Sequence, residues 1–305
     1  MTNTPQPANI FESAVCLSVS LSRLGTRRKV SSSKVEVEAD KDMIHVTKDI
    51  IQSKELKDIV RVDGEIKAFL RNVALPSVFR GGVYLLPIAL VEMTDAKLEE
   101  FRASRIEKVE VFLTSYPTLV EQAQQKLRDL SSPTDYPPVE VVRTTFGMDT
   151  QYLTFGVPGQ LEAISKAIFK REQEKSAAKV QEQADQIVQV LTLSMKDLVD
   201  HMVDRLTPDA DGKKKIFRDS LVKNMGEFLT TLKARNLTND VKLDTLADQA
   251  KSLLDGVDPA TLREADNIRE YVRSGMEKIK EELDVMVTLR PSRKIVFEED
   301  EEDEG

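Results

Sequence analysis

The stretch VQEQADQIVQVLTLSMKDLVDHMVDRL, residues 180–206, places apolar side chains along one face of a helix. These side chains recur every three or four residues, at Val180, Ala184, Ile187, Leu191, Met195, Leu198, Met202 and Leu206. Such spacing is typical of a coiled-coil-like stripe that needs a second helix to cover it. Because residues 160–206 contain neither proline nor glycine, they are predicted to form one long helix.

Three amphipathic segments after this stretch are candidates to cover the stripe. They span residues 213–234, 241–254 and 259–287. Asp258 followed by Pro259 is the order of a capping residue and a first-turn proline. The second half of the chain is therefore predicted to be an antiparallel helical bundle.

The first half of the chain is richer in turns and contains β-like runs. The run AVCLSVSL around Cys16 alternates apolar residues with others, which predicts a strand. Helices are predicted over residues 50–73 and 95–130, with a break at Pro117, and short strands at 139–142 and 151–159. A single cysteine excludes an internal disulfide and a cysteine-based zinc site.

The most apolar run is VYLLPIALV, residues 83–91, and it has two interpretations. A buried strand ended by Pro87 would place Tyr84, Leu85 and Leu86 in a core. A membrane-active protein would instead insert this segment after rearrangement. A membrane-spanning helix takes about 20 apolar residues, so the run predicts no stable transmembrane segment, and the core strand is preferred.

Together these patterns predict a mainly α protein: an elongated helical bundle with a long coiled-coil-like helix, plus a small β-sheet in the N-terminal half. The predicted segments are a disordered N-terminus (1–13), a small mixed sheet with helices (14–158), a long-helix bundle (159–290) and an acidic tail (291–305). The first residues carry no cationic start and no apolar run, so no signal peptide is expected and a cytoplasmic location is predicted.

The net charge of -8 comes mainly from one run, EEDEEDE, at Glu298–Glu304. Without these seven acids, 45 acidic residues face 44 basic ones. A nearly neutral body argues against nucleic acid as the main ligand, because phosphate binding needs a basic excess.

Two interpretations of this acidic run are open. It either solubilises the chain without a partner, or it guides binding. In the second case an apolar segment (Ile295, Val296, Phe297) docks as a strand on a sheet edge. The acids that follow (Glu298, Glu299, Asp300) then meet a basic surface on a partner or the patch formed by Arg27, Arg28 and Lys29.

Motifs for catalysis or cofactor binding are not found in the sequence. The chain has no GxxxxGK[ST], GxGxxG, GxSxG or HExxH pattern, and its two histidines, His45 and His201, are far apart. The run TPDADG, residues 207–212, lacks the first acid of a calcium loop and is predicted to be a turn. We therefore expect no catalytic residue, no cofactor, no metal ligand and no enzyme activity.

The succession VCLSVSL, a helix, and FRGGVYLLPIALVEMTDAKLEEFRASRIEKVEVFLTSYPTLV is similar to an uncharacterised bacterial and phage family known as a domain of unknown function. The matching positions, within residues 14–130, are Gly82, Tyr84, Leu85, Leu86, Pro87, Phe112, Leu113, Tyr116 and Pro117. The resemblance implies a MoxR-type AAA ATPase or a von Willebrand factor A protein as partner. With no catalytic motif, we expect a non-enzymatic adaptor or scaffold, with homo-oligomerisation through the helix stripe (Ile187, Leu191, Met195, Leu198, Met202) as an alternative.

Overall fold

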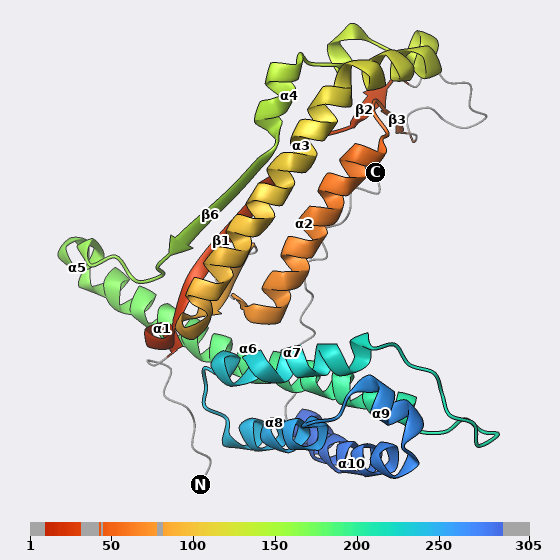
Figure 1. The fold of residues 1–305 in the computed structure, drawn as a ribbon. Helices are drawn as coiled ribbons and strands as arrows, with labels where there is room; N and C mark the ends of the chain where they lie inside the picture. The colour runs from red at the N-terminus through yellow and green to blue at the C-terminus, as the bar shows by residue number, and fades with distance from the viewer. Residues whose placement is uncertain (1–9, 32–42, 44, 78–81, 289–305) are drawn as a thin grey trace. The chain divides into compact units, whose positions relative to one another are not determined.

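The computed structural model describes residues 10–31, 43, 45–77 and 82–288 (Figure 1). In chain order the elements are α1 (Ile10–Ser13), β1 (Ala14–Ser22), β2 (Arg27–Val30), β3 (Val46–Asp49), α2 (Lys54–Val73), β4 (Leu75–Pro76), β5 (Val83–Pro87), η4 (Ile88–Leu90), α3 (Val91–Leu127), η5 (Arg128–Leu130), η6 (Pro133–Asp135), α4 (Val139–Thr145), β6 (Gly147–Leu153), α5 (Gln160–Ile164), α6 (Lys166–Leu206), α7 (Ser220–Arg235), α8 (Val241–Leu254), α9 (Pro259–Glu264) and α10 (Asp266–Thr288). The predicted mainly α fold with a small sheet is confirmed.

The described chain forms two compact units. The bundle unit takes the described residues within 1–17, 71–91 and 152–297. The second unit takes those within 18–70 and 92–151. The units thus do not coincide with the predicted division between residues 158 and 159, because the described residues within 71–77 and 82–91 group with the helices of the second half of the chain.

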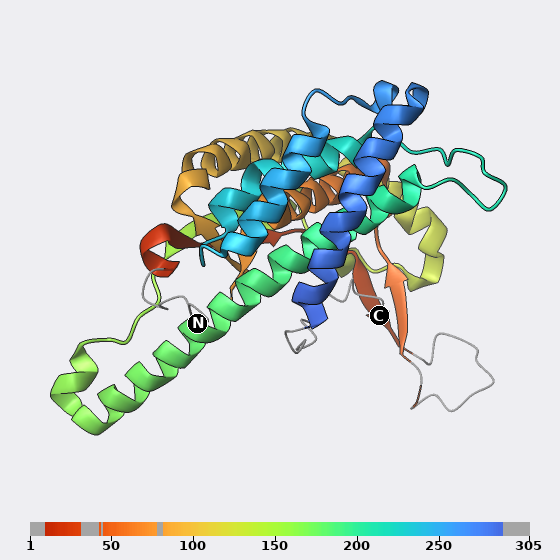
Figure 2. The same cartoon turned by 90° about the horizontal axis from the view of Figure 1, so that it is seen from below.

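The bundle unit is built around α6. Helices α7 and α10 both pack on α6, and α8 packs on both of them (Figure 2). Six of the eight stripe residues are buried in this core, and the other two, Val180 and Leu198, are half-buried. The chain's own helices thus cover the stripe, which removes it as a surface for homo-oligomerisation.

Three predicted helix boundaries in the bundle unit need correction. The helix expected over residues 160–206 is broken at Ser165, whose side chain caps α6 by accepting a hydrogen bond from the Ile168 amide. A similar break at Ala265 separates α9 from α10. Helix α7 begins at Ser220 rather than at residue 213. Asp258 does cap α9 as predicted, since its Oδ1 atom accepts from the Thr261 amide at 2.7 Å.

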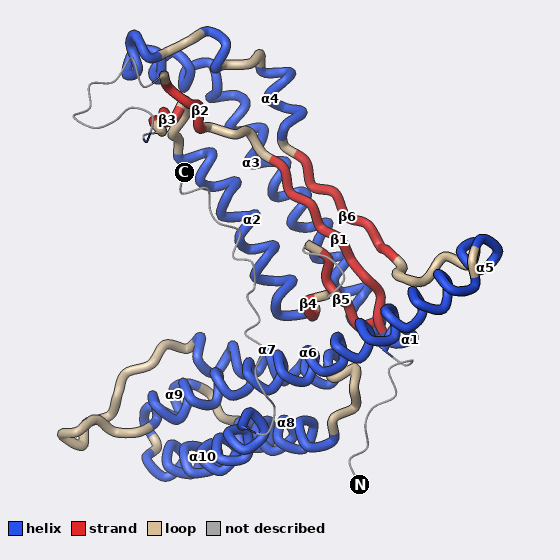
Figure 3. Tube along the Cα trace, turned by 180° about the vertical axis from the view of Figure 1, so that it is seen from behind, coloured by secondary structure: helices blue, strands red, loops and turns tan. Residues whose placement is uncertain are grey.

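Two strands complete the core of the bundle unit. β4 and β5 pair antiparallel, with Leu75 opposite Leu85, in a sheet of order β4-β5-β1-β6 (Figure 3). Leu75, Leu85 and Cys16 share one hydrophobic core with α6, α7, α8 and α10. The predicted core strand at residues 83–87 is thus confirmed. Ile10, which the sequence placed in a disordered N-terminus, begins α1 and is 2% exposed in the same core.

Two buried arginines hold helix ends in the bundle unit. Arg269 donates to the carbonyl oxygens of Arg205 (2.7 Å) and Leu206 (3.0 Å), the last residues of α6. Arg235 donates to the carbonyls of Arg71 (3.3 Å) and Ala74 (3.4 Å), where α2 ends. Because the last carbonyls of a helix have no partner inside the helix, these side chains supply the missing donors. Burial lowers the pKa of Arg235 to about 10 and also lowers that of Arg269.

Helix α3 of the second unit differs from its prediction at Pro117, which lies inside a continuous helix. A proline in a helix interior costs about 3 kcal/mol. Phe112, Leu113 and Tyr116, on the turn before it, are 0–3% exposed, so core packing offsets this cost.

The segment after α3 also differs in part from its prediction. Residues 139–145 form α4 instead of a strand, with Val142 fully buried on one face. A strand, β6, is present at 147–153, but it overlaps the expected strand at 151–159 only over residues 151–153, and residues 154–159 are not in a strand. A helix buries Val142 in the same cluster as Phe112, which a single isolated strand could not do without unpaired backbone groups.

Arginines on α3 contact the neighbouring elements of the second unit. Arg105 pairs with Asp63 of α2 at 2.7 Å and donates to the Ser22 carbonyl of β1, also at 2.7 Å. Arg102 donates to the Met148 carbonyl and to the Thr150 hydroxyl of β6. Breaking a buried pair such as Arg105–Asp63 leaves an uncompensated charge, so these contacts fix the strands against α3.

Candidate functional site

The described residues offer little of the chemistry that catalysis needs. They contain no group of three or more His, Cys, Asp or Glu side chains that could hold a metal ion. The Cys16 thiol is 1% exposed, and burial raises its pKa, so the reactive thiolate is disfavoured. His201 is exposed on α6 and accepts a hydrogen bond from Arg205 at 3.4 Å.

A shallow hollow lies in the second unit. It has a volume of about 220 Å³, below the roughly 300–1,000 Å³ of ordinary ligand sites. Three arginines line it, but each already has an acidic partner: Arg102 contacts Glu99, Arg105 contacts Asp63 and Arg143 contacts Glu110. The hollow therefore has no strong preference for an anion, and we assign it no ligand.

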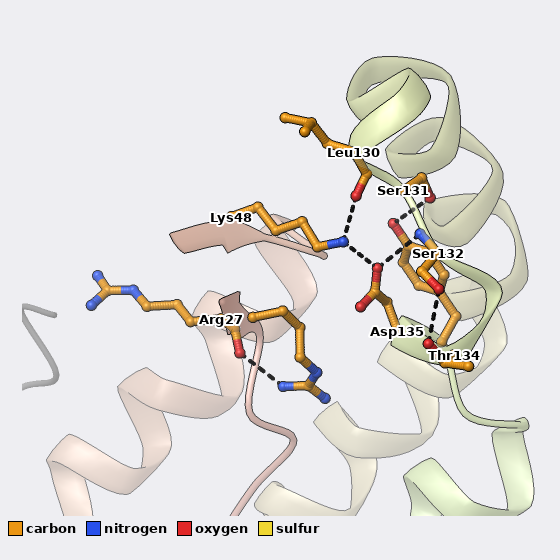
Figure 4. Close-up of polar contacts among 9 residues, drawn as sticks. Arg27, Lys48, Leu130, Ser131, Ser132, Thr134 and Asp135 are labelled. Carbon is orange, nitrogen blue, oxygen red and sulfur yellow. Dashed lines mark hydrogen bonds and ion pairs between the residues drawn. The ribbon is translucent and has the colours of Figure 1, made fainter. Parts of the chain in front are cut away.

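The predicted basic patch forms a two-stranded ribbon. β2 pairs antiparallel with β3, placing Arg27 opposite Asp49 and Arg28 opposite Lys48. Lys48 anchors the inner face, since its Nζ atom lies 2.5 Å from both the Leu130 carbonyl oxygen and the Asp135 carboxylate (Figure 4). The side chains of Lys48 and Asp135 are 9% and 10% exposed, so this pair is largely shielded from solvent.

The pKa of Asp135 reflects this anchor. Burial alone would raise it, but hydrogen bonds from Lys48 and from the Ser132 amide, with the charges of Lys48 and Arg28, outweigh burial and lower the pKa. The carboxylate is thus ionised in the folded protein and bound to the ribbon. This contact fixes the ribbon against the turn that follows α3.

The outer face of the ribbon is only weakly basic. Arg28 is half-buried and donates to the carbonyls of Gly25 and Arg27, both at 2.9 Å. Arg27 faces out, 3.7 Å from the carboxylate of Asp49, and Lys29 is exposed. Of the three predicted basic residues, Arg27 and Lys29 are thus exposed on the surface, and Arg27 is paired with Asp49.

A more basic surface lies on the first part of α6, which we call the basic arm, residues 166–179. It contains five basic and two acidic residues, a net charge of +3, and all five basic side chains are exposed. They are Lys166, Lys170, Arg171, Lys175 and Lys179. Among described residues, burial in α6 begins only at Gln183, so the arm extends beyond the packed part of the helix (Figure 2).

Charges within the basic arm are partly paired. Glu172 accepts from Lys175 at 2.9 Å and lies 3.3 Å from Arg171. The hydrogen bond from Lys175, aided by Arg171, lowers the pKa of Glu172. Pairing of this exposed kind contributes little energy and leaves the arm positively charged overall. We did not predict this segment as a basic surface, although its composition already shows the excess of basic residues.

The other predicted site residues fall elsewhere. Leu85 and Leu86 are 1% and 0% exposed, and Pro87 is buried beside them. Removing one such side chain from a core costs about 1.5–3 kcal/mol, so membrane insertion would require the strand to leave its packing. No helix among the described residues is long and apolar enough to cross a bilayer. Ile295, Val296, Phe297, Glu298, Glu299 and Asp300 lie outside the described residues.

Comparison of the chain with family models, curated proteins and solved structures finds no match. The resemblance to the bacterial and phage family stays a prediction.

Proposed function

We propose that the protein is a non-enzymatic helical adaptor that binds an acidic protein surface through the basic arm. The observation that carries this proposal is the division of α6: its second part is buried against α7 and α10, whereas residues 166–179 have a net charge of +3 and all five of their basic side chains are exposed. A helix held at one end in a core keeps a fixed direction at the other, which suits recognition.

The chemistry of the arm indicates a partner that is acidic rather than apolar. Each exposed ion pair contributes about 0–1 kcal/mol, so several must act together and the contact weakens with salt. Charges arranged in this way mainly speed association and select the partner. The resemblance described above favours an AAA ATPase or a von Willebrand factor A protein as that partner.

Affinity capture from the native host tests the proposal when it uses matched charge variants. One variant carries Lys170→Glu, Arg171→Glu and Lys175→Glu in the basic arm. The control carries Lys223→Glu, Lys233→Glu and Lys251→Glu, three exposed positions on α7 and α8. The two variants change the net charge equally, and circular dichroism checks that both are folded.

We expect the wild-type chain and the α7–α8 control to retain the same bound protein, and the arm variant to lose it. If the control variant loses the partner equally, total charge rather than the arm governs binding. If the arm variant keeps the partner, the basic arm is not the binding surface and the proposal is wrong.

A further inference from the structure

The direction of α10 relates the end of the described chain to the basic arm. At the beginning of α10, Arg269 contacts Leu206, the last residue of α6. Further along, Lys280 pairs with Asp200 at 2.8 Å, and Asp284 pairs with Lys196. The residue numbers rise in α10 as they fall in α6, so the two helices are antiparallel. The chain therefore leaves α10 at Thr288 heading toward the first part of α6 (Figure 2).

The chain beyond α10 is long enough to reach the arm. Continuing the pairing, Thr288 lies level with about residue 192 of α6, roughly 20 Å from Lys179 at 1.5 Å per helical residue. The nine residues 289–297 can span about 30 Å when extended. Pro291 opposes continuation of the helix, which favours such an extended path. The acids from Glu298 onward can thus lie beside the arm.

The charges of the two segments match in order along this path. The first basic residues met after α10 are Arg290, Arg293 and Lys294, and the part of α6 level with them on an extended path, about residues 179–188, carries Glu182 and Asp185 and, at its far end, Lys179. Beyond them come the seven acids of residues 298–304, level with the arm and its net charge of +3. Reversing the direction of either segment would place like charges together.

Apolar residues of the two segments match as well. Phe169 and Val180 lie on the same side of α6 as its buried stripe and are half-buried. Ile168, at the start of the arm, and Ile164, the last residue of α5, are 38% and 76% exposed. The run Ile295, Val296 and Phe297 comes immediately before the acids. Apolar contacts supply the affinity that exposed charges lack.

We propose that residues 289–305, the acidic segment, lie antiparallel along the basic arm of the same chain and cover the surface that the partner uses. The segment then acts as a built-in competitor: a partner binds only by displacing it. This regulatory role rests on the proposed function, whereas the contact between segment and arm does not. The surface that the acids contact thus differs from the predicted patch at Arg27, Arg28 and Lys29, since here the acids contact the basic arm rather than the ribbon.

Carbodiimide cross-linking of the full-length protein tests the contact, because the reagent joins a lysine amine to a carboxylate that touches it. Mixing isotope-labelled and unlabelled copies separates links within one chain from links between chains. We expect mass spectrometry to find links from residues 298–304 to Lys170 or Lys175 within one chain. The summed intensity of links from residues 298–304 to the arm should fall about tenfold in Lys170→Gln/Lys175→Gln, in which only the remaining arm lysines can react. It should not fall in the control Lys223→Gln/Lys233→Gln. Links to Lys29, links only between copies, or no links would overturn the proposal.

Binding of a synthetic peptide with the sequence of residues 289–305 tests the competition. A full-length variant in which the seven acids become Gln or Asn leaves the arm uncovered, so fluorescence anisotropy should show at least tenfold tighter binding to it than to the wild type. Binding should weaken as salt rises. Equal affinity for both proteins would overturn the inference. Because neither assay uses the partner, an arm variant that still captures the partner contradicts only the proposed function.

Discussion

The Nε atom of Arg269 donates a hydrogen bond to the carbonyl oxygen of Leu206, 3.0 Å away, and so ties α10 to the end of α6. Its guanidinium also lies 5.7 Å from the ring centre of Phe217, which anchors the connection between α6 and α7. Since Arg269 is 6% exposed, water cannot replace these contacts. One side chain thus closes one end of the bundle.

Replacing this side chain should destabilise the bundle strongly. In Arg269→Leu the carbonyls of Arg205 and Leu206 lose buried donors, and we expect the free energy of unfolding to fall by about 2–4 kcal/mol. Urea denaturation measures the change. The control Lys278→Leu, at an exposed position of the same helix, should leave the unfolding midpoint within experimental error. Equal effects of both substitutions would show that Arg269 is not a capping residue.

Two glycines inside helices should respond to alanine with opposite signs. A Cβ atom at Gly226 of α7 would meet nothing within 4 Å, so Gly226→Ala should stabilise by about 0.5–1 kcal/mol through helix propensity. At Gly275 of α10 the Cβ atom would lie 2.5 Å from both methyl groups of Leu253, and Gly275→Ala should destabilise by about 1 kcal/mol despite the same propensity gain. Thermal denaturation compares the two.

The Leu253→Ala background provides the control for this contact. Once the methyl groups are gone, Gly275→Ala should become stabilising, because only the propensity gain remains. If Gly275→Ala still destabilises the protein in this background, the contact with Leu253 is not the reason that position 275 requires glycine.

Acid should release the ribbon through Asp135. The pKa of this carboxyl group is lowered below its ordinary value of 3.8 in the folded state. The stabilising contribution of the ionised carboxylate is therefore fully present above the pKa of the unfolded state, and it is lost as the pH falls through the lower pKa of the folded state. We expect Asp135→Asn to lower the free energy of unfolding at pH 7. The difference from wild type should shrink below about pH 4. Chemical denaturation at a series of pH values measures both, and a constant difference at all pH values would contradict the assignment.

The Cys16 thiol should report on unfolding. It is buried and its pKa is raised, so a thiol reagent at pH 8 should label the folded protein slowly and the urea-unfolded protein at once. The labelling rate should rise with destabilisation in Arg269→Leu. Rapid labelling of the folded wild type would show that the strand β1 opens locally.

Local patterns in the sequence determined the elements whose signals are short-range. The stripe of α6, the bounds of α8 at Val241–Leu254 and the cap at Asp258 follow from periodicity and capping chemistry, which act within a few residues. The apolar run at residues 83–87 was likewise long enough to predict a buried strand. The charges of the basic arm can also be read from composition.

Tertiary structure decided which of these surfaces stay exposed and which local signals are overridden. Val139–Thr145 became a helix and Pro117 stayed inside α3 because burial of Val142 and Phe112 outweighs local preference. The same apolar face of α6 is buried from Gln183 onward, where Lys196 and Asp200 pair with α10, whereas Phe169 and Val180 before it are only half-buried. Where a covering helix ends depends on contacts between residues far apart in the chain, and no periodicity within α6 records it.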